Sequence, residues 1–180
     1  GQDTIISNNT GDLRLPGATG AADVLSIDAG SATDTVQITD DAGRITLTSS
    51  MLQYGTAIAP TSLGTVNFLN QSLEGEAATV TGGASSNILD LSGWSVNAAG
   101  TIDVNATATV NGAGGNDTFV GPNRAAAPTQ VDWTINAADT GTVGTFTFAS
   151  TENLIGGNAV DVFTFAADGI VTGTVDGGGA

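Results

Sequence analysis

Apolar and polar residues alternate in short runs along this chain. An amphipathic helix would repeat its apolar residues at intervals of three and four, whereas alternation with a period of two is typical of a strand with one buried face. The runs are rich in Val, Ile, Thr and Phe, and clusters of Gly, Asn and Asp separate them, which favours strands joined by turns. The sequence therefore predicts an all-β protein. The runs are "DTIIS" at 3–7, "DVLSI" at 23–27, "DTVQI" at 34–38, "RITLT" at 44–48, "NILDL" at 87–91 and "DVFTF" at 161–165.

Residues 82–104 and 156–177 resemble each other. Both segments begin with Gly-Gly, place Asn or Asp at the head of a strand and end in Gly-Thr-Ile/Val-Asp, at offsets of 74 (156 − 82) and 73 (173 − 100). Each copy holds about three short strands in roughly 22 residues, which suits one coil of a stacked repeat. We therefore expect a right-handed parallel β-helix or related β-solenoid of roughly eight coils, with 1–81 as a first segment and 82–180 as a repeat unit continuous with it. The alternative is a pair of β-sandwich modules of about 90 residues each.

The strand heads share a pattern in which Asp or Asn comes two residues before an apolar residue. We expect this side chain to hydrogen-bond the turn that precedes the strand. Phe119 and Phe163 occupy the same place after their aspartates, so both are predicted to lie in the interior. Trp94 and Trp133 are also predicted to fill the core, the alternative being exposed indoles that stack on sugars. The heads are Asp3, Asp23, Asp34, Asn87, Asp117 and Asp161.

The chain is strongly acidic but contains few charged residues. Its 180 residues include 18 acidic side chains and three arginines, for a net charge of −15, although only 12% of the residues are charged. A nucleic-acid partner is therefore not expected. With 40% hydrophobic residues, the chain has enough apolar surface for a continuous core. No apolar run approaches the roughly 18 residues of a membrane span.

Missing residue types exclude several reaction chemistries. The sequence has no Cys, His or Lys. A Ser-His-Asp triad, a thiol nucleophile, a standard zinc site and a Schiff-base amine therefore cannot form. Carboxylate chemistry and cations bound by oxygen ligands remain.

The glycine-rich turns suggest calcium as a candidate ligand. Residues 112–120, "GAGGNDTFV", and 156–164, "GGNAVDVFT", each depart at one glycine from the nonapeptide in which aspartates and glycine carbonyls of successive turns bind Ca²⁺. Asp117 and Asp161 would be the ligands. They lie 44 residues apart (161 − 117), whereas the calcium geometry needs consecutive turns. We therefore expect turns that retain the shape without the ion, with calcium binding as the alternative.

Paired carboxylates also permit a polysaccharide-cleaving β-helix, because glycoside hydrolysis needs only an acid and a base or nucleophile. Aromatic residues make up just 5% of the chain, however, which is few for a sugar cleft. We therefore expect no enzymatic activity. The candidate carboxylates are Asp40, Asp41, Glu74, Glu76 and Asp103.

The second half of the chain, 82–180, contains the motifs "NILDLSGW", "NGAGGNDTFVG", "VDWTINAADTGTVGTFTFASTENLIGGNAVDVFTF" and the closing "GTVDGGGA". With these motifs it resembles a repeat unit of giant bacterial surface proteins. Filamentous-haemagglutinin-like and beta strand repeat proteins carry a similar Gly-Asn-Asp-Thr-Phe turn, a Trp-x-Ile strand and a Gly-Thr-Ile-Asp-Gly-Gly strand. The resemblance implies a secreted, elongated β-solenoid that belongs to a larger bacterial cell-surface protein.

The function that we expect is structural: a stiff spacer, fibre or adhesin stalk without cofactors. A carbohydrate- or calcium-binding surface module is the alternative. No segment has the signature of a capping element, so we expect the ends to pack on neighbouring coils of the same long chain or on further copies placed end to end.

Overall fold

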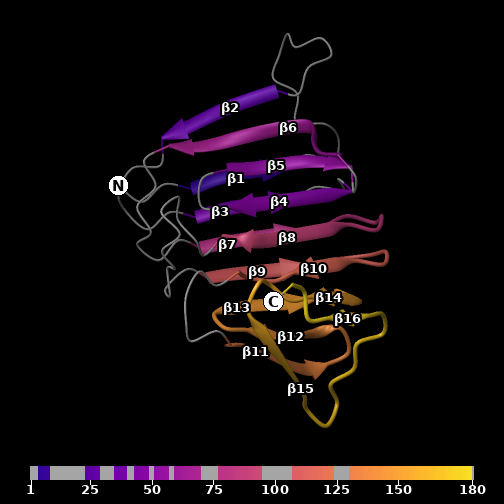
Figure 1. Cartoon of the computed structure of the whole chain (residues 1–180). Coiled ribbons are helices and arrows are strands. Elements are labelled where there is room, and N and C mark those ends of the chain that lie inside the picture. Colours follow the sequence, from indigo (N-terminus) through magenta and orange to yellow (C-terminus); the bar gives the residue numbers. More distant parts are fainter. Residues whose placement is uncertain are drawn as a thin grey trace.

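A computed structural model of the chain shows an all-β fold built from two sheets (Figure 1). It describes residues 4–8, 23–28, 35–39, 43–48, 51–56, 59–69, 77–94, 107–123 and 130–179. For 4–8, 23–28 and 59–69, and for most of 35–39 and 51–56, the description covers only the backbone path and strand pairing. The described residues form sixteen strands and no helix, which confirms the all-β prediction.

Each sheet contains eight strands, and we name the sheets A and B. The order in sheet A is β1 (Thr4–Asn8), β3 (Thr35–Thr39), β7 (Ala77–Thr81), β9 (Thr107–Asn111), β13 (Phe146–Ala149), β12 (Thr140–Val143), β11 (Gln130–Ala137) and β15 (Val160–Phe165). The order in sheet B is β2 (Asp23–Asp28), β6 (Ala59–Leu69), β5 (Met51–Thr56), β4 (Arg44–Thr48), β8 (Ile88–Gly93), β10 (Thr118–Val120), β14 (Asn153–Ile155) and β16 (Val175–Asp176).

Most neighbouring strands are parallel, because the chain alternates between the two sheets. A strand of sheet A is followed, after a short turn, by a strand of sheet B in the pairs β3–β4, β7–β8, β9–β10 and β13–β14. Parallel neighbours need a crossover connection, and here the crossover contains a strand of the opposite sheet. Two antiparallel meanders interrupt this alternation, β4–β5–β6 in sheet B and β11–β12–β13 in sheet A.

Successive parallel partners in sheet A are farther apart in sequence than expected. Thr39 pairs with Thr81, Thr81 with Asn111, and Asn111 with Ala149, at separations of 42, 30 and 38 residues. The prediction of about 22 residues per coil is therefore too short. One reason is that the antiparallel meanders lie between β3 and β7 and between β9 and β13. Each sheet also contains strands from both 1–81 and 82–180, so two separate sandwich modules do not describe this arrangement.

Apolar side chains form continuous rows on the inner faces of the sheets. In sheet B, Ile45, Leu89, Phe119 and Leu154 pair in register and are each 0% exposed. The corresponding row of sheet A also passes through Gly141, and its apolar members are at most 2% exposed. Burial of these rows supplies the main hydrophobic stabilisation. The apolar members of the sheet A row are Ile38, Val80, Val110, Phe148 and Ile135.

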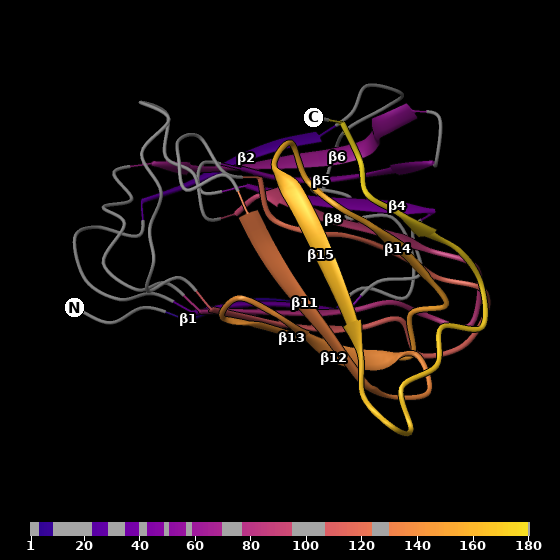
Figure 2. The same ribbon diagram turned by 60° about the horizontal axis from the view of Figure 1, so that its bottom comes forward.

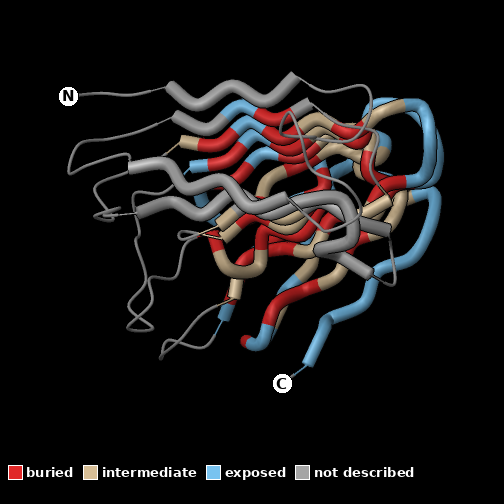
Figure 3. The backbone as a smooth tube through the Cα atoms, turned by 90° about the horizontal axis from the view of Figure 1, so that it is seen from above, coloured by how far each residue is buried: buried red, intermediate tan, exposed pale blue. Residues whose placement is uncertain are grey.

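The outer face of sheet A carries a row of threonines. In Figure 3 buried and exposed positions alternate along the strands, as a period of two requires. The Thr147 hydroxyl donates to the Thr109 hydroxyl at 3.3 Å. Matched threonines on neighbouring strands add cross-strand stability. The row consists of Thr79, Thr109, Thr147, Thr142, Thr134 and Thr164.

An aromatic cluster fills the core near β11. The ring of Trp133 lies 5.6 Å from that of Phe119 and stacks on Phe163 at 5.0 Å, measured between ring centroids. The structure places Phe119, Trp133 and Trp94 in the core, with at most 1% of each exposed. Phe163 is only half-buried, unlike Phe119. Its strand β15 is the last in sheet A, and no further described strand covers it.

One end of the stack is partly covered by the chain itself. Figure 2 shows β11 and β15 running obliquely across this end, between the edges of the two sheets. Trp133 on β11 thereby reaches Phe119 on β10 in the opposite sheet. This arrangement differs from the expectation that no element of the chain covers an end. The sequence did not predict this covering, because the turns of an antiparallel meander look the same whether or not the meander covers an end of the stack.

Candidate functional site

Three turns share a packing of glycine against an Asn or Asp side chain. In each turn, the Asn or Asp five residues after the glycine lies against that glycine, in the pairs Gly82–Asn87, Gly112–Asp117 and Gly156–Asp161. The Asn87 amide oxygen also accepts the Gly83 N–H at 2.8 Å. A six-residue signature, Gly-x-x-x-x-Asn/Asp, therefore encodes the same packing of glycine against Asn or Asp three times, and the second turn differs by its positive φ angles at Ala113 and Gly115.

Glycine is required at the first position because two groups approach it closely. A Cβ on Gly112 would lie 2.6 Å from Asp117 Oδ2 and would also overlap the Ser150 carbonyl oxygen, whereas side-chain Cβ atoms do not approach other atoms within 3.0 Å. At Gly82 the second obstacle is the carbonyl oxygen of Gly112, at 2.6 Å. The turns are therefore packed both within themselves and against the next turn in the stack.

The three turns do not occupy the same corner of the stack. Gly82 and Gly112 follow β7 and β9, where the chain passes from sheet A to sheet B. Gly156 instead follows β14 in sheet B, and backbone hydrogen bonds place it in line with Gly121 and the end of β16. The similarity of 82–104 to 156–177 therefore reflects a shared turn and does not mark equivalent positions in the stack.

A ladder of polar side chains runs along the corner after β7, β9 and β13. Asn87, Asp117 and Glu152 immediately precede residues that pair in register, and so they occupy equivalent positions. The Asn87 N–H donates to Asp117 Oδ1 at 2.7 Å, and the Asp117 N–H donates to Glu152 Oε2 at 2.6 Å. Each carboxylate thus accepts the N–H of the preceding level. We call these three residues the corner ladder.

Two of the three residues of the corner ladder are buried and Glu152 is half-buried, so the ladder matters for stability. Asn87 is 1% exposed and Asp117 is 0% exposed. A buried backbone N–H without a partner costs free energy, and hydrogen bonds to charged acceptors are stronger than neutral ones. The carboxylates therefore replace the strand partners that the backbone loses where the chain turns.

Asp161 has a different partner at the opposite corner. Its Oδ1 accepts the indole N–H of buried Trp133 at 2.7 Å. Burial raises the pKa of Asp161 above its ordinary value of 3.8, while the hydrogen bonds from Trp133 and from the Gly157 backbone act in the opposite direction. Asp161 therefore holds the tryptophan in the core, and the proton affinity of its carboxyl group increases on folding.

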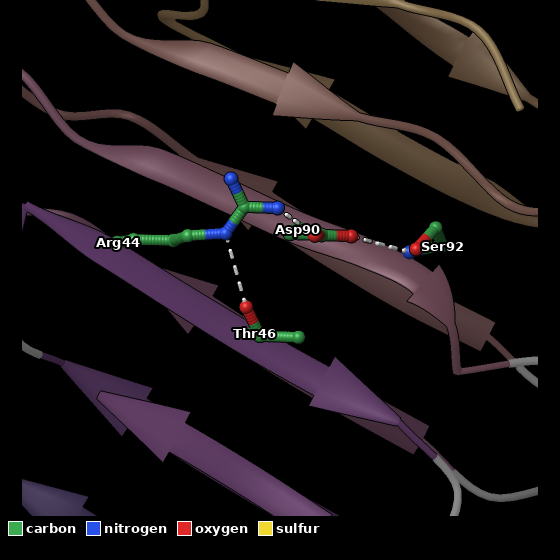
Figure 4. A network of polar contacts seen from close by, with 4 residues as sticks. All are labelled: Arg44, Thr46, Asp90 and Ser92. Carbon is green, nitrogen blue, oxygen red and sulfur yellow. Dashed lines mark hydrogen bonds and ion pairs between the residues drawn. The ribbon is translucent and has the colours of Figure 1, made fainter. Parts of the chain in front are cut away.

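Figure 4 shows a second polar network, on β4 and β8 of sheet B. The Arg44 guanidinium forms an ion pair with Asp90, and its Nε donates to the Thr46 hydroxyl at 3.3 Å. The other Asp90 oxygen accepts the Ser92 N–H at 3.1 Å. Asp90 is only 6% exposed, so its charge is neutralised by a partner on the neighbouring strand.

The proposed calcium ligands lie at different corners and hold other partners. Asp117 Oδ1 accepts a backbone N–H, and Asp161 Oδ1 accepts an indole N–H. Within the described ranges, no group of three or more acidic side chains is placed to bind a metal ion. Calcium binding at Asp117 or Asp161 stays the untested alternative. The carboxylates considered for catalysis, Asp40, Asp41, Glu74, Glu76 and Asp103, lie outside the described residues.

Sequence reasoning missed Glu152 and the Arg44–Asp90 pair. The turn that holds Glu152, between β13 and β14, is shorter than the first two turns of this corner. The residues before Glu152, "AST", contain no glycine, so the six-residue signature is missing there. Only the register of β14 against β10 reveals its equivalence to Asp117. Arg44 and Asp90 are 46 residues apart, but both lie in alternating runs, so a register prediction for β4 and β8 could have found the pair.

No protein-family model, curated protein or solved structure matches this chain. The described residues include no helix that is both long enough and apolar enough to cross a membrane.

Replacing Gly112 with Ala should destabilise the protein strongly, because the new methyl group overlaps a backbone carbonyl and the Asp117 side chain. We expect a loss of more than about 2 kcal/mol in the free energy of unfolding, measured with urea. Gly114→Ala in the same turn is the matched control. Its Cβ would meet nothing closer than 3.8 Å, so we expect a change within about 1 kcal/mol. Equal losses in the two variants would contradict the packing described for this turn.

Replacing Asp161 should distinguish its hydrogen bond from its charge. Asp161→Ala removes the acceptor for the buried Trp133 N–H and should cost about 1–3 kcal/mol. Asp161→Asn retains one acceptor oxygen and should cost less.

The pH dependence has a definite sign. Because the pKa of Asp161 is raised on folding, this carboxyl group lowers stability as the pH rises from 3.8 through its folded pKa. The stability of Asp161→Asn relative to the native chain should therefore increase over that pH window. Urea unfolding at several pH values measures this difference, and a constant or decreasing difference would contradict the assignment.

Proposed function

We propose that this chain is a non-enzymatic structural segment of a large secreted or cell-surface protein, in which it acts as a stiff spacer, fibre or adhesin stalk. In this proposal the two sheets form a β-solenoid, whose coils are the successive A and B strands joined by the glycine turns. The likeness of 82–180 to repeat units of giant bacterial surface proteins agrees with an extracellular, bacterial location.

One observation carries the proposal: inner rows, outer rows and corners all repeat in register from one level to the next. Gly82 N–H bonds the Asn111 carbonyl at 2.8 Å, and Gly112 N–H bonds the Ala149 carbonyl at 3.0 Å. The hydrogen-bond ladder therefore continues from the strands into the turns. A stack bonded in this way resists bending and local opening, because separating two levels breaks many bonds at once.

The surface chemistry supports a spacer more than a binding module. Both tryptophans of the chain are buried, so neither indole is exposed to stack on a sugar. The net charge of −15 keeps neighbouring fibres apart and in solution. Carbohydrate and calcium binding therefore remain alternatives without a supporting contact in the described part of the chain.

Mechanical loading tests the proposed function on a single copy. The chain has no cysteine, so thiol handles can be placed with Gln37→Cys on β3 and Thr164→Cys on β15, both at exposed positions. Force applied through these handles acts across most of sheet A. We expect a stiff response with little extension until one cooperative rupture.

The control uses handles at Thr109→Cys and Thr164→Cys, which load only the second half of sheet A. This variant should show a similar rupture with a shorter initial length. Gradual extension at low force in both variants would overturn the role as a stiff spacer, whatever the association state of the protein.

A further inference from the structure

The only Asn-Gly dipeptide of the sequence lies at the corner after β9. It consists of Asn111, the last residue of β9, and Gly112, the first residue of the turn. Asn-Gly is the dipeptide most prone to spontaneous loss of a side-chain amide. Glycine has no side chain to shield its nitrogen, and it readily adopts the backbone conformations that the reaction needs. This dipeptide is therefore a candidate site of covalent modification that needs no enzyme.

The reaction is an intramolecular substitution followed by hydrolysis. The Gly112 backbone nitrogen attacks Asn111 Cγ, a new N–C bond forms, and the side-chain amide leaves as ammonia after taking up the proton of the attacking nitrogen. The cyclic succinimide that results then reacts with one water molecule. Opening at one carbonyl group gives aspartate. Opening at the other gives isoaspartate, in which the backbone runs through the side-chain methylene. Water is the only co-reactant.

Both groups of the peptide bond between these two residues are hydrogen-bonded to neighbouring levels of the stack. The Asn111 carbonyl oxygen accepts the Gly82 N–H at 2.8 Å, and the Gly112 N–H donates to the Ala149 carbonyl oxygen at 3.0 Å. Ala149, on β13, also pairs in register with Asn111. The nitrogen must lose its partner and turn toward Cγ before it can attack. The reaction is therefore blocked while β9 and β13 stay paired.

The carbon that is attacked is held by a contact that does not cross between levels. Asn111 Oδ1 accepts the Ala113 N–H at 3.0 Å, within the same turn. A contact of this kind holds the side chain over the peptide group that follows it. Ala113 has a φ of 71°, which residues other than glycine rarely adopt, so the turn depends on such support. Separation of β13 from β9 would thus free the nitrogen and leave Cγ beside it.

We propose that Asn111 and Gly112 form a self-modification site that becomes active when β13 separates from β9, and that its isoaspartate product prevents the corner from closing again. Isoaspartate adds an atom to the backbone directly before Gly112. A single methyl group on Gly112 would already overlap the Ser150 carbonyl oxygen and lie 2.6 Å from Asp117 Oδ2. The corner therefore has no room for a longer backbone. The proposal rests on the geometry of this turn and does not depend on the proposed structural function.

The neighbouring levels supply a matched variant without the amide. Thr81 pairs in register with Asn111 and precedes Gly82 as Asn111 precedes Gly112. Ala149 pairs with Asn111 on the other side. Threonine and alanine carry no amide, so this reaction cannot occur at either level. Asn111→Thr removes the reactive group and introduces the residue that the preceding level uses at the equivalent position.

Peptide mass spectrometry of the complete 180-residue chain tests whether folding blocks the reaction. The chain is incubated at mildly alkaline pH, either folded in buffer or unfolded in urea. Isoaspartate at Asn111 is then measured by mass and by enzymatic methylation. It should form about tenfold or more slowly in the folded chain, because only open molecules react. Glu152→Ala removes the acceptor of the Asp117 N–H between the same two levels and should raise the rate in the folded chain. Equal rates in folded and unfolded chains, or no increase in Glu152→Ala, would overturn the proposal.

Refolding tests the effect of the product. Native chain that has been modified in urea is returned to buffer, and circular dichroism then follows its unfolding by urea. Molecules with isoaspartate should unfold at a lower urea concentration than fresh protein, whereas Asn111→Thr should keep its own midpoint after the same incubation. Asn111→Ala, with the residue found at Ala149, replaces Asn111→Thr if that variant does not fold. An unchanged midpoint in the modified native chain, or an equal loss in the variant, would contradict the proposal.

Discussion

The structure depends on how the backbone is hydrogen-bonded where the chain turns from one sheet to the other. Strands stacked about 4.8 Å apart satisfy their own N–H and C=O groups, but a turn usually loses this pairing. Here the turns are stacked at the same spacing as the strands, with glycine where two turns meet and a carboxylate where an N–H would lack a partner. Gly112 and Asp117 meet both requirements within one six-residue turn.

The hydrophobic core follows from this constraint. Because the turns keep successive levels in register, Leu89, Phe119 and Leu154 lie directly in line and exclude water along the row. A shift of one residue at a turn would move each apolar side chain to the outer face. The antiparallel meanders add strands to one sheet at a time, and the meander of sheet A leads into the end of the stack that β11 and β15 cross (Figure 2).

Several features of this fold could be read from the sequence, and others could not. Period-two alternation around Ile45, Leu89 and Phe119 was enough to predict strands with a buried face. The glycine turns were also visible, because their packing is local. The position of each turn in the stack could not be predicted. Gly82 and Gly156 have similar sequence neighbours, but Gly82 follows a strand of sheet A and Gly156 follows a strand of sheet B. Glu152 and the Asp161–Trp133 bond depend on register between distant strands, which local composition does not specify.

Amide hydrogen exchange, followed residue by residue by NMR, tests the central claim most directly. If the corner ladder replaces strand pairing, the Asn87 and Asp117 amides should exchange as slowly as those of Val80 and Val110 in the adjoining strands. The amide of exposed Gly115, in the same turn, donates no hydrogen bond within the described part of the chain and should exchange much faster. Exchange of Asn87 and Asp117 at the rate of Gly115 would show that the corners open independently of the sheets and would contradict this account.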